Sequence, residues 1–471
     1  MEPVRSELVV VGGGPGGYAA AFYAADLGIE VILVERENKL GGVCLHRGCI
    51  PSKALLHATH QIVAAAESAQ RGIKFEPPAI DLPALRAWKD SVLEKLAGGV
   101  MWLANKRGVQ VMHGRAYFED SQTLRVETVQ GQRFIRFDHA IVAVGSVPAM
   151  PKLFDLGNPR VMTSDEALAV QEVPDTLLVV GGGYIGMELG TVYARLGSKV
   201  VLVEMLDRLL AGADPDLAAF VVANAKKAFK EIRLATRVTH VATAGKHIKV
   251  KMLYANSELE EFYDRVLVAV GRVPNTDDLG LENTKVTFDE KGFVKVNAHQ
   301  QTDDPRIFAI GDVVGGMMLA HKAHREARVA VEVIHGTPSA FENVVIPAVV
   351  YTDPELAWCG LTEAEAHARG IRCEVTKFPW SASGRAVSFD RTDGMTKMLV
   401  DPETERVLGV GIVGTGAGEL ISEAVLALEM GATAADIALT VHPHPTLSET
   451  LMECAEAFYG YATHTLTRKR A

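Results

Sequence analysis

The chain lacks several features that would mark a specialised class of protein. Its 471 residues include only 5 cysteines, too few for a secreted framework held together by disulfides. It has no apolar run near the roughly 18 residues of a transmembrane helix. A formal net charge of -10 does not suit a nucleic-acid partner. The first residues show no secretory leader pattern, so we expect a cytoplasmic protein with no membrane or nucleic-acid partner.

What the chain does have is a regular alternation of short apolar segments with helix-like stretches. The apolar segments cover residues 8–11, 31–34, 141–144, 177–180, 200–203, 266–270 and 307–310. This alternation is typical of parallel sheets covered by helices. The length corresponds to about three domains at about 150 residues each.

Two of these units repeat each other. In each copy three glycines follow an apolar segment, and an acidic residue ends the next apolar segment at the same distance. The first copy contains Gly12, Gly14, Gly17 and Glu35, and the second contains Gly181, Gly183, Gly186 and Glu204. Such glycines allow a tight turn and close approach of a pyrophosphate to a helix N-terminus, while the acid accepts hydrogen bonds from a ribose. The repeat therefore predicts two dinucleotide sites.

The acid at the end of the second copy also bears on the choice of cofactor. The carboxylate of Glu204 would repel a 2′-phosphate, which favours NAD over NADP, although Arg208 lies nearby. In a second internal repeat, residues 143–148 resemble residues 269–274, and Gly145 of the first segment corresponds to Gly271 of the second. The sequence thus duplicates more than the glycine turn alone.

Cys44 and Cys49 form a close pair just before the helix-like run 53–67. A cysteine at a helix N-terminus near cations ionises below its usual pKa of about 8.5, and Cys49 has that location, so we favour a redox role for the pair. Two unrelated buried cysteines, a static disulfide or a zinc site using His46 are the alternatives. Zinc sites usually bring a second pair of ligands, which is missing here, and we expect no metal site.

Several longer motifs point to one family. They are 41–45 (GGVCL), 49–56 (CIPSKALL), 181–188 (GGGYIGME), 271–275 (GRVPN), 307–312 (IFAIGD), 318–322 (MLAHK) and 444–449 (HPTLSE). With these motifs the chain resembles the pyridine nucleotide-disulfide oxidoreductases over essentially its whole length. Within that family it is most similar to the members that oxidise dihydrolipoamide and pass the electrons to NAD.

The resemblance implies FAD in the first nucleotide site and NAD in the second. The expected FAD-site residues are Gly12, Gly14, Gly17, Glu35, Lys53, Gly145, Asp312 and Ala320. The expected NAD-site residues are Gly181, Gly183, Gly186, Glu188, Glu204 and Gly271. Asp312 would bind the ribitol region, and the helix that begins near Ala320 would direct its dipole at the reduced flavin. Lys53 and Glu188 would meet beside the flavin.

The resemblance also assigns roles to four catalytic residues. Cys44 would exchange with the substrate dithiol, and Cys49 would pass electrons to the flavin. His444 would act as general base, with Glu449 orienting its imidazole. For Glu449 an alternative is capping alone, because residues 446–449 also fit a capping box. In the family this base serves the disulfide of the other subunit, which implies a homodimer.

The fold that follows is α/β, with two Rossmann-like nucleotide-binding domains and a C-terminal α+β dimerisation domain. We expect an FAD-binding domain from residues 1–148 and 271–345, an NAD-binding domain from 149–270, and the dimerisation domain from 346–471. The expected partner is dihydrolipoamide on a lipoyl domain of an E2 or H protein. Which 2-oxo acid or glycine cleavage complex it serves is not encoded in any motif of the chain.

The chain departs from the family pattern between its cysteines, where it has His46 and Arg47 instead of Asn and an apolar residue. The hypothesis is that Arg47 lowers the pKa of a cysteine. The alternative functions are a glutathione- or mercuric-reductase-like enzyme, or a flavin-binding scaffold without turnover. Glu204 argues against a glutathione-reductase-like enzyme, and the absence of a C-terminal cysteine pair argues against a mercuric-reductase-like enzyme. The intact catalytic residues argue against a scaffold.

Overall fold

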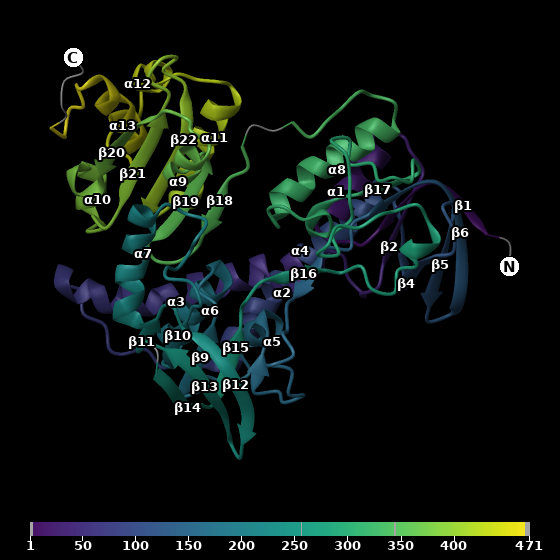
Figure 1. The fold of residues 1–471 in the computed structure, drawn as a ribbon, viewed down its shortest axis with the longest axis horizontal. Coiled ribbons are helices and arrows are strands. Elements are labelled where there is room, and N and C mark those ends of the chain that lie inside the picture. The colour runs from purple at the N-terminus through teal and green to yellow at the C-terminus, as the bar shows by residue number, and fades with distance from the viewer. Residues whose placement is uncertain (1–2, 256, 343–344, 467–471) are drawn as a thin grey trace.

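The computed structural model describes residues 3–255, 257–342 and 345–466 (Figure 1). Figure 1 shows three lobes, with the N-terminal strands at one side, a central lobe below, and the C-terminal lobe at the opposite upper corner. Each lobe is built around its own sheet. The predicted α/β class is confirmed, with an α+β C-terminal part.

The first lobe contains a seven-stranded sheet with a parallel core. The parallel strands are β1 (Val4–Val11), β2 (Val31–Glu35), β3 (Gln110–His113), β6 (Gly131–Val142) and β17 (Ile307–Ala309). Two antiparallel strands extend the sheet, β4 (Arg115–Phe118) and β5 (Thr123–Thr128). Because β17 pairs with β6, a late part of the chain completes the N-terminal sheet. Helices α1 (Pro15–Asp26) and α8 (Ala320–Ile334) pack together on it.

The second lobe contains a five-stranded parallel sheet. Its strands are β8 (Val161–Met162), β9 (Thr176–Val180), β10 (Lys199–Val203), β11 (Glu231–Arg233) and β15 (Arg265–Val268). Helices α5 (Ser164–Ala169), α6 (Tyr184–Leu196) and α7 (Pro215–Ala228) belong to this lobe. An antiparallel sheet of β12 (Arg237–Ala244), β13 (His247–Tyr254) and β14 (Ser257–Tyr263) adds to it. The apolar pattern predicted β9, β10 and β15, but not β8, β11 or this three-stranded addition.

The two lobes meet at the second internal repeat. Strand β7 (Ser146–Pro148) pairs antiparallel with β16 (Arg272–Pro274). The two repeated segments therefore lie against each other, at the two points where the chain passes between the sheets. The domain boundaries expected at residues 148 and 271 fall at this pair and stay a prediction.

The C-terminal lobe is built on an antiparallel five-stranded sheet. Its strands are β18 (Ala348–Val350), β19 (Glu355–Gly360), β20 (Glu374–Pro379), β21 (Met395–Val400) and β22 (Val407–Gly414). Helices α11 (Ala417–Glu429) and α13 (Glu449–Tyr459) pack on this sheet, and the short α9 (Glu363–Ala368) and α12 (Ala434–Ala438) lie in the same lobe.

One apolar cluster joins the lobes. It contains Leu55 and Leu56 of α3 (Cys49–Ser68), Leu217 of α7 and Val413 of β22, all of which are buried. Burying these side chains contributes about 1.5–3 kcal/mol each, so the lobes are packed against one another. Helix α3 connects directly to this cluster, which gives the residues at its N-terminus a rigid support. Among the described residues, no helix is both long and apolar enough to cross a membrane.

Candidate active site

A cavity of about 660 Å³ lies where the first sheet, helix α3 and the second lobe meet. Among its lining residues are all but one of those expected at the FAD site and the redox pair: Gly12, Gly14, Glu35, Cys44, Cys49, Lys53, Gly145, Asp312 and Ala320. Glu188, expected at the NAD site, also lines it. Residues far apart in the sequence thus line one cavity, which is large enough for a sizeable organic ligand.

The glycine turn after β1 fits a pyrophosphate. A Cβ on Gly12, whose φ is +104°, would lie 2.5 Å from the carbonyl oxygen of Ala143, and a Cβ on Gly17 would lie 1.7 Å from the carbonyl oxygen of Gly12. By contrast, the nearest atom to a Cβ on Gly14, at the N-cap of α1, is 3.9 Å away. Gly12 and Gly17 therefore allow close packing inside the protein, whereas Gly14 leaves room for a ligand at the helix N-terminus.

Glu35 stands at the end of β2 beside this turn. Its Oε2 accepts a hydrogen bond from the backbone N–H of Gly13 at 2.7 Å, and its Oε1 accepts one from Glu37 at 2.8 Å. These bonds hold the carboxylate in the cavity wall, and each oxygen keeps a further lone pair. The carboxylate is therefore oriented to accept hydrogen bonds from a ribose.

Cys44 lies on α2 (Gly42–Arg47), and Cys49 is the first residue of α3. The two helices are separated only by Gly48, so both thiols face the same cavity. Both are free thiols, and each shifts the pKa of the other. Such proximity is what a pair needs to alternate between dithiol and disulfide.

The two thiols differ in acidity. The hydrogen bond from Cys44 lowers the pKa of Cys49 to about 7, and the charge of Lys53 acts in the same direction against burial. The same hydrogen bond, together with burial and the charge of Cys49, raises the pKa of Cys44 well above its ordinary value. Of the two thiols, Cys49 is therefore the one that ionises first, at the N-terminus of a 20-residue helix.

Lys53 and Glu188 meet as the sequence predicted. The Lys53 Nζ lies 2.8 Å from Glu188 Oε2 and 4.4 Å from the centre of the Tyr351 ring. The other oxygen of Glu188 accepts the backbone N–H of Tyr351 at 3.0 Å. Glu188 is almost completely buried, and a buried carboxylate requires such partners. The Lys53 ammonium is thus fixed one helical turn from Cys49.

Asp312 lies in the short 3₁₀ segment η3 (Gly311–Val314) and accepts a hydrogen bond from the Ser146 hydroxyl. Arg272 donates to both the hydroxyl and the carbonyl oxygen of Ser146, at 2.7 Å each. Ala320 begins the 15-residue helix α8 in the same cavity wall. The helix thus directs its N-terminal dipole at the cavity. Sequence reasoning missed Ser146 and Arg272, which lie at corresponding positions of the second internal repeat.

The second glycine turn copies the first. A Cβ on Gly181 would lie 2.3 Å from the carbonyl oxygen of Ala269, and a Cβ on Gly186 would lie 2.0 Å from that of Gly181. A Cβ on Gly183, at the N-cap of α6, would meet no atom within 4 Å. Glu204 accepts the backbone N–H groups of Gly182 at 2.6 Å and Leu206 at 2.8 Å. This turn has the same room for a pyrophosphate.

Two further residues were expected at this second site. Gly271 stands directly before β16, with a φ of +123°. Glu188 is on α6 but faces the first cavity, through Lys53. The second turn and the redox cavity are therefore connected by one helix.

His444 and Glu449 also meet. The His444 Nδ1 lies 2.9 Å from Glu449 Oε1, and Glu449 Oε2 accepts the backbone N–H of Thr446 at 2.7 Å. Although partial burial opposes it, these two hydrogen bonds lower the pKa of Glu449. Helix α13 begins at Glu449, with Ser448 as its N-cap, so Thr446 is not the cap of a capping box. The Glu449 carboxylate therefore bonds both the His444 imidazole and the backbone N–H of Thr446.

His444 stands apart from the redox pair of its own chain. Its side chain is 73% exposed, and it is not among the residues that line the cavity. Figure 1 shows the lobe that contains α13 far from α2. Within one chain the imidazole therefore has no path to either thiol.

The hypothesis about Arg47 finds no support in its contacts. The guanidinium pairs with Glu37 and Asp165, and the lysine that lowers the pKa of Cys49 is Lys53. The partners of Arg47 come from other segments of the chain. Their proximity could not be inferred from the sequence.

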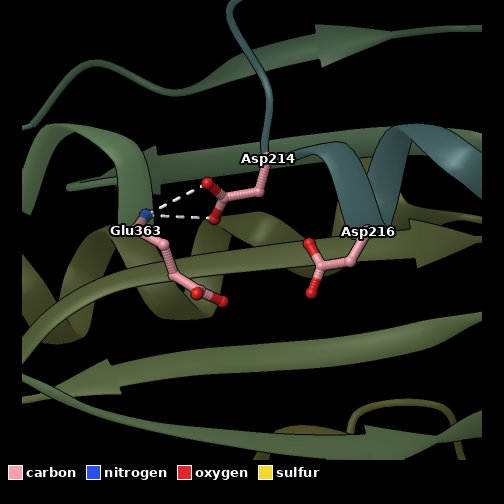
Figure 2. Close-up of side chains that lie close together, drawn as sticks. All are labelled: Asp214, Asp216 and Glu363. Atoms are coloured by element: carbon pink, nitrogen blue, oxygen red, sulfur yellow. Dashed lines mark hydrogen bonds between the residues drawn. The ribbon is translucent and has the colours of Figure 1, made fainter. Parts of the chain in front are cut away.

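One group of carboxylates outside the cavity has the arrangement of metal ligands (Figure 2). Asp214, Asp216 and Glu363 lie together where α7 approaches α9, and the Glu363 N–H donates to both oxygens of Asp214 at 3.1 and 3.2 Å. However, the Nζ of the buried Lys397 lies 2.8 Å from Asp214 and 3.0 Å from Asp216, and it also contacts Glu363. A buried ammonium requires such partners. The group is an ion-pair network between two lobes.

Comparisons with known proteins agree with this site. Residues 6–327 match the family described as pyridine nucleotide-disulphide oxidoreductase, and residues 346–455 match the dimerisation domain of the same family. The chain is 47% identical to the dihydrolipoyl dehydrogenase of Vibrio parahaemolyticus over 467 residues, covering 99% of this chain and 98% of that protein. It is 44% identical to the dihydrolipoyl dehydrogenase of Geobacillus stearothermophilus with the same coverage.

Two solved structures have a similar shape over nearly the whole chain. LpdA of Mycobacterium tuberculosis superposes with a TM-score of 0.89 at 26% identity, covering 96% of this chain and 99% of that one. The flavoprotein disulfide reductase RclA of Escherichia coli, induced by HOCl, gives a TM-score of 0.85 at 26% identity, with the same coverage. The expected cofactors, FAD and NAD, are confirmed by the family match. The chain belongs to the pyridine nucleotide-disulphide oxidoreductases.

Proposed function

We propose that the chain is a dihydrolipoyl dehydrogenase, which oxidises dihydrolipoamide to lipoamide and reduces NAD. The observation that carries this function is the pair Cys44 and Cys49, which lie together in the wall of a cavity that has the fingerprint of a dinucleotide site. Full-length relatives with this name support it. The chemistry is a transfer of two electrons from one dithiol to another and onward to a nicotinamide.

The cavity residues suit FAD. Gly14 and the N-terminus of α1 would hold the pyrophosphate, Glu35 the ribose of the adenosine, and Asp312 the ribitol. Gly145 and Ala320 would line the remaining wall. When bound, FAD supplies the two-electron relay between a dithiol and NAD. On the other turn Gly183 and Glu204 would hold NAD, and the carboxylate disfavours a 2′-phosphate.

The acidity of the two thiols suggests their order of reaction. A thiolate of dihydrolipoamide attacks the sulfur of Cys44 in the Cys44–Cys49 disulfide, which forms a mixed disulfide and releases Cys49 as thiolate. Cys49 is the better leaving group because its pKa is lowered to about 7. The second substrate sulfur then attacks the first, which closes lipoamide and releases Cys44. Two electrons thereby reside in the protein dithiol.

Each attacking substrate thiol must lose a proton. His444 is the proposed base, because Glu449 fixes its Nδ1 and leaves Nε2 toward the surface. Since the imidazole is remote from the cysteines of its own chain, it would serve those of a partner subunit. The match to the dimerisation domain supports a homodimer.

The biological setting follows from the substrate. Dihydrolipoamide would arrive on a lipoyl domain of an E2 or H protein, in the cytoplasm. We divide the chain into an FAD-binding domain of residues 1–148 and 271–345, an NAD-binding domain of 149–270 and a dimerisation domain of 346–471. The pairing of β7 with β16 and of β17 with β6 supports this division.

The test mixes the purified protein with dihydrolipoamide and either NAD or NADP, and follows the absorbance of the reduced nicotinamide and of the flavin. We expect rapid reduction of NAD and slow reduction of NADP. Flavin reduction without transfer to NAD would contradict the NAD-dependent activity and lead to trials with glutathione disulfide. Bound flavin that neither dihydrolipoamide nor NADH reduces would indicate a scaffold.

A further inference from the structure

Arg47 is the last residue of α2, the short helix between the two redox cysteines. Its Nη1 and Nη2 lie 3.3 and 3.4 Å from Glu37 Oε1. Its Nε lies 3.3 Å from Asp165 Oδ2. One guanidinium therefore contacts two carboxylates from different segments of the chain.

The two carboxylates belong to the two nucleotide-binding units. Glu37 follows β2, two residues after Glu35, whereas Asp165 is in the first turn of α5 in the second lobe. All three charged residues line the cavity assigned to FAD. The ion pairs thus cross the cavity wall from one unit to the other, with the redox segment between them.

The contact is partly shielded from solvent. The side chain of Arg47 is 35% exposed and that of Asp165 is 26% exposed. Burial raises the pKa of Asp165, and the charges of Arg47 and Arg272 oppose that rise. The two arginines therefore favour the ionised form of Asp165. A planar guanidinium can reach two carboxylates at once, which the single amine of a lysine cannot do with the same geometry.

We propose that Arg47 is a positioning residue that ties the redox segment to both nucleotide-binding units and thereby holds FAD in its cavity. This inference depends on the proposed function only in assigning the cavity to FAD. Loss of the guanidinium leaves Glu37 and Asp165 without their common partner. The cavity wall then separates along the line between α2 and α5, through which the flavin leaves.

The experiment measures the release of FAD from the holoenzyme by the rise in flavin fluorescence after dilution. We expect Arg47→Met to release FAD about tenfold faster, the factor that corresponds to loss of about 1.4 kcal/mol from two partly exposed ion pairs. Asp165→Asn removes only one of the two pairs and should therefore accelerate release less than Arg47→Met does. The double variant should release FAD no faster than Arg47→Met, because Arg47→Met already removes the pair with Asp165.

The matched control is Arg107→Met. Arg107 is 31% exposed, and its Nε pairs with Asp26 at 2.9 Å, outside the cavity lining. Its release rate should equal that of the parent protein. Arg47→Lys should fall between the parent and Arg47→Met. Circular dichroism of each holoenzyme excludes a folding defect; if Arg47→Met does not fold, Asp165→Asn carries the test.

An unchanged release rate in Arg47→Met or Asp165→Asn would overturn the proposal, and so would strictly additive effects in the double variant. Equal acceleration in Arg107→Met would attribute the effect to loss of any surface ion pair and would also overturn it. A failure of the proposed function is distinguishable, because flavin release is measured without dihydrolipoamide or NAD.

Discussion

The two nucleotide turns have nearly the same local structure in different surroundings. Gly12 and Gly181 both approach a carbonyl oxygen closely, and Glu35 and Glu204 both accept the N–H of the middle glycine of the turn. The first turn, however, opens into a cavity shared with the thiols. Beside the second, Met205 is 67% exposed and Leu206 is 47% exposed.

This difference indicates that recognition of a dinucleotide and its retention depend on different parts of the structure. The glycines and the acid provide recognition of a dinucleotide in both copies. At the first copy, residues of α2, α5 and α8 also line the cavity. We therefore expect a retained FAD in the first and an exchangeable NAD in the second.

The largest effect should come from Cys49→Ser, which separates the two halves of the reaction. Dihydrolipoamide oxidation should fall by at least about a thousandfold, as for removal of a nucleophilic residue. Reduction of the flavin by NADH should persist, because the second turn is untouched. Stopped-flow absorbance measures both. Loss of the NADH reaction as well would mean that the two halves are not separable.

Matched alanine substitutions test the comparison itself. Gly12→Ala and Gly181→Ala both introduce a Cβ within 2.5 Å of a carbonyl oxygen at a positive φ, at a cost of about 1–3 kcal/mol, or about five- to a hundredfold in affinity. Gly12→Ala should lose FAD during purification. Gly181→Ala should retain its flavin and show a higher KM for NAD. The flavin-to-protein absorbance ratio and steady-state kinetics would expose the reverse pattern.

Glu204→Ala should reduce the preference for NAD over NADP by about tenfold, because a charged hydrogen-bond acceptor for the ribose is lost. The ratio of kcat/KM for the two cofactors measures this preference. Asp207→Ala, which removes an exposed charge from the same segment, is the control. An equal change in both variants would mean that general charge, and not the Glu204 carboxylate, sets the preference.

The smallest effect concerns pH and belongs to the first cavity alone. Lys53 lowers the pKa of Cys49, which is about 7 with the lysine present. Lys53→Met should therefore move the formation of the thiolate-flavin charge-transfer band to higher pH. Lys39→Met removes an exposed lysine paired with Glu94 and should leave the titration unchanged. A midpoint that stays in place in Lys53→Met would exclude the lysine as the cause.

The sequence predicted the parts of this site that depend on local spacing. The glycine turns, the acids at the strand ends and the cysteine pair each follow from a short segment in which residue type and spacing suffice. Motif resemblance added Lys53 with Glu188 and His444 with Glu449, whose contacts are present in the structure. Their catalytic roles stay proposals.

Contacts between distant segments could not be predicted. The backbone N–H of Tyr351 bonds to Glu188 across 163 residues, and Ser146 bonds to Asp312 across 166. The partners of Arg47 come from the ends of two other elements. No periodicity or spacing connects such pairs, because tertiary packing alone brings them together. The sheet of β12, β13 and β14 was missed because its buried residues, such as Ile248, Val250 and Met252 of β13, alternate with polar residues and form no continuous apolar run.

The exposed position of His444 has a consequence for mixtures of inactive proteins. If each site combines the thiols of one chain with the imidazole of another, Cys44→Ser and His444→Gln homodimers are both inactive. Exchanging their subunits creates hybrid dimers with one intact site of the two. That site combines the thiols of the His444→Gln chain with the imidazole of the Cys44→Ser chain. Random pairing would make hybrids half of all dimers, so about a quarter of the parent activity should return. Defects in two different positions can thus compensate each other within one assembly.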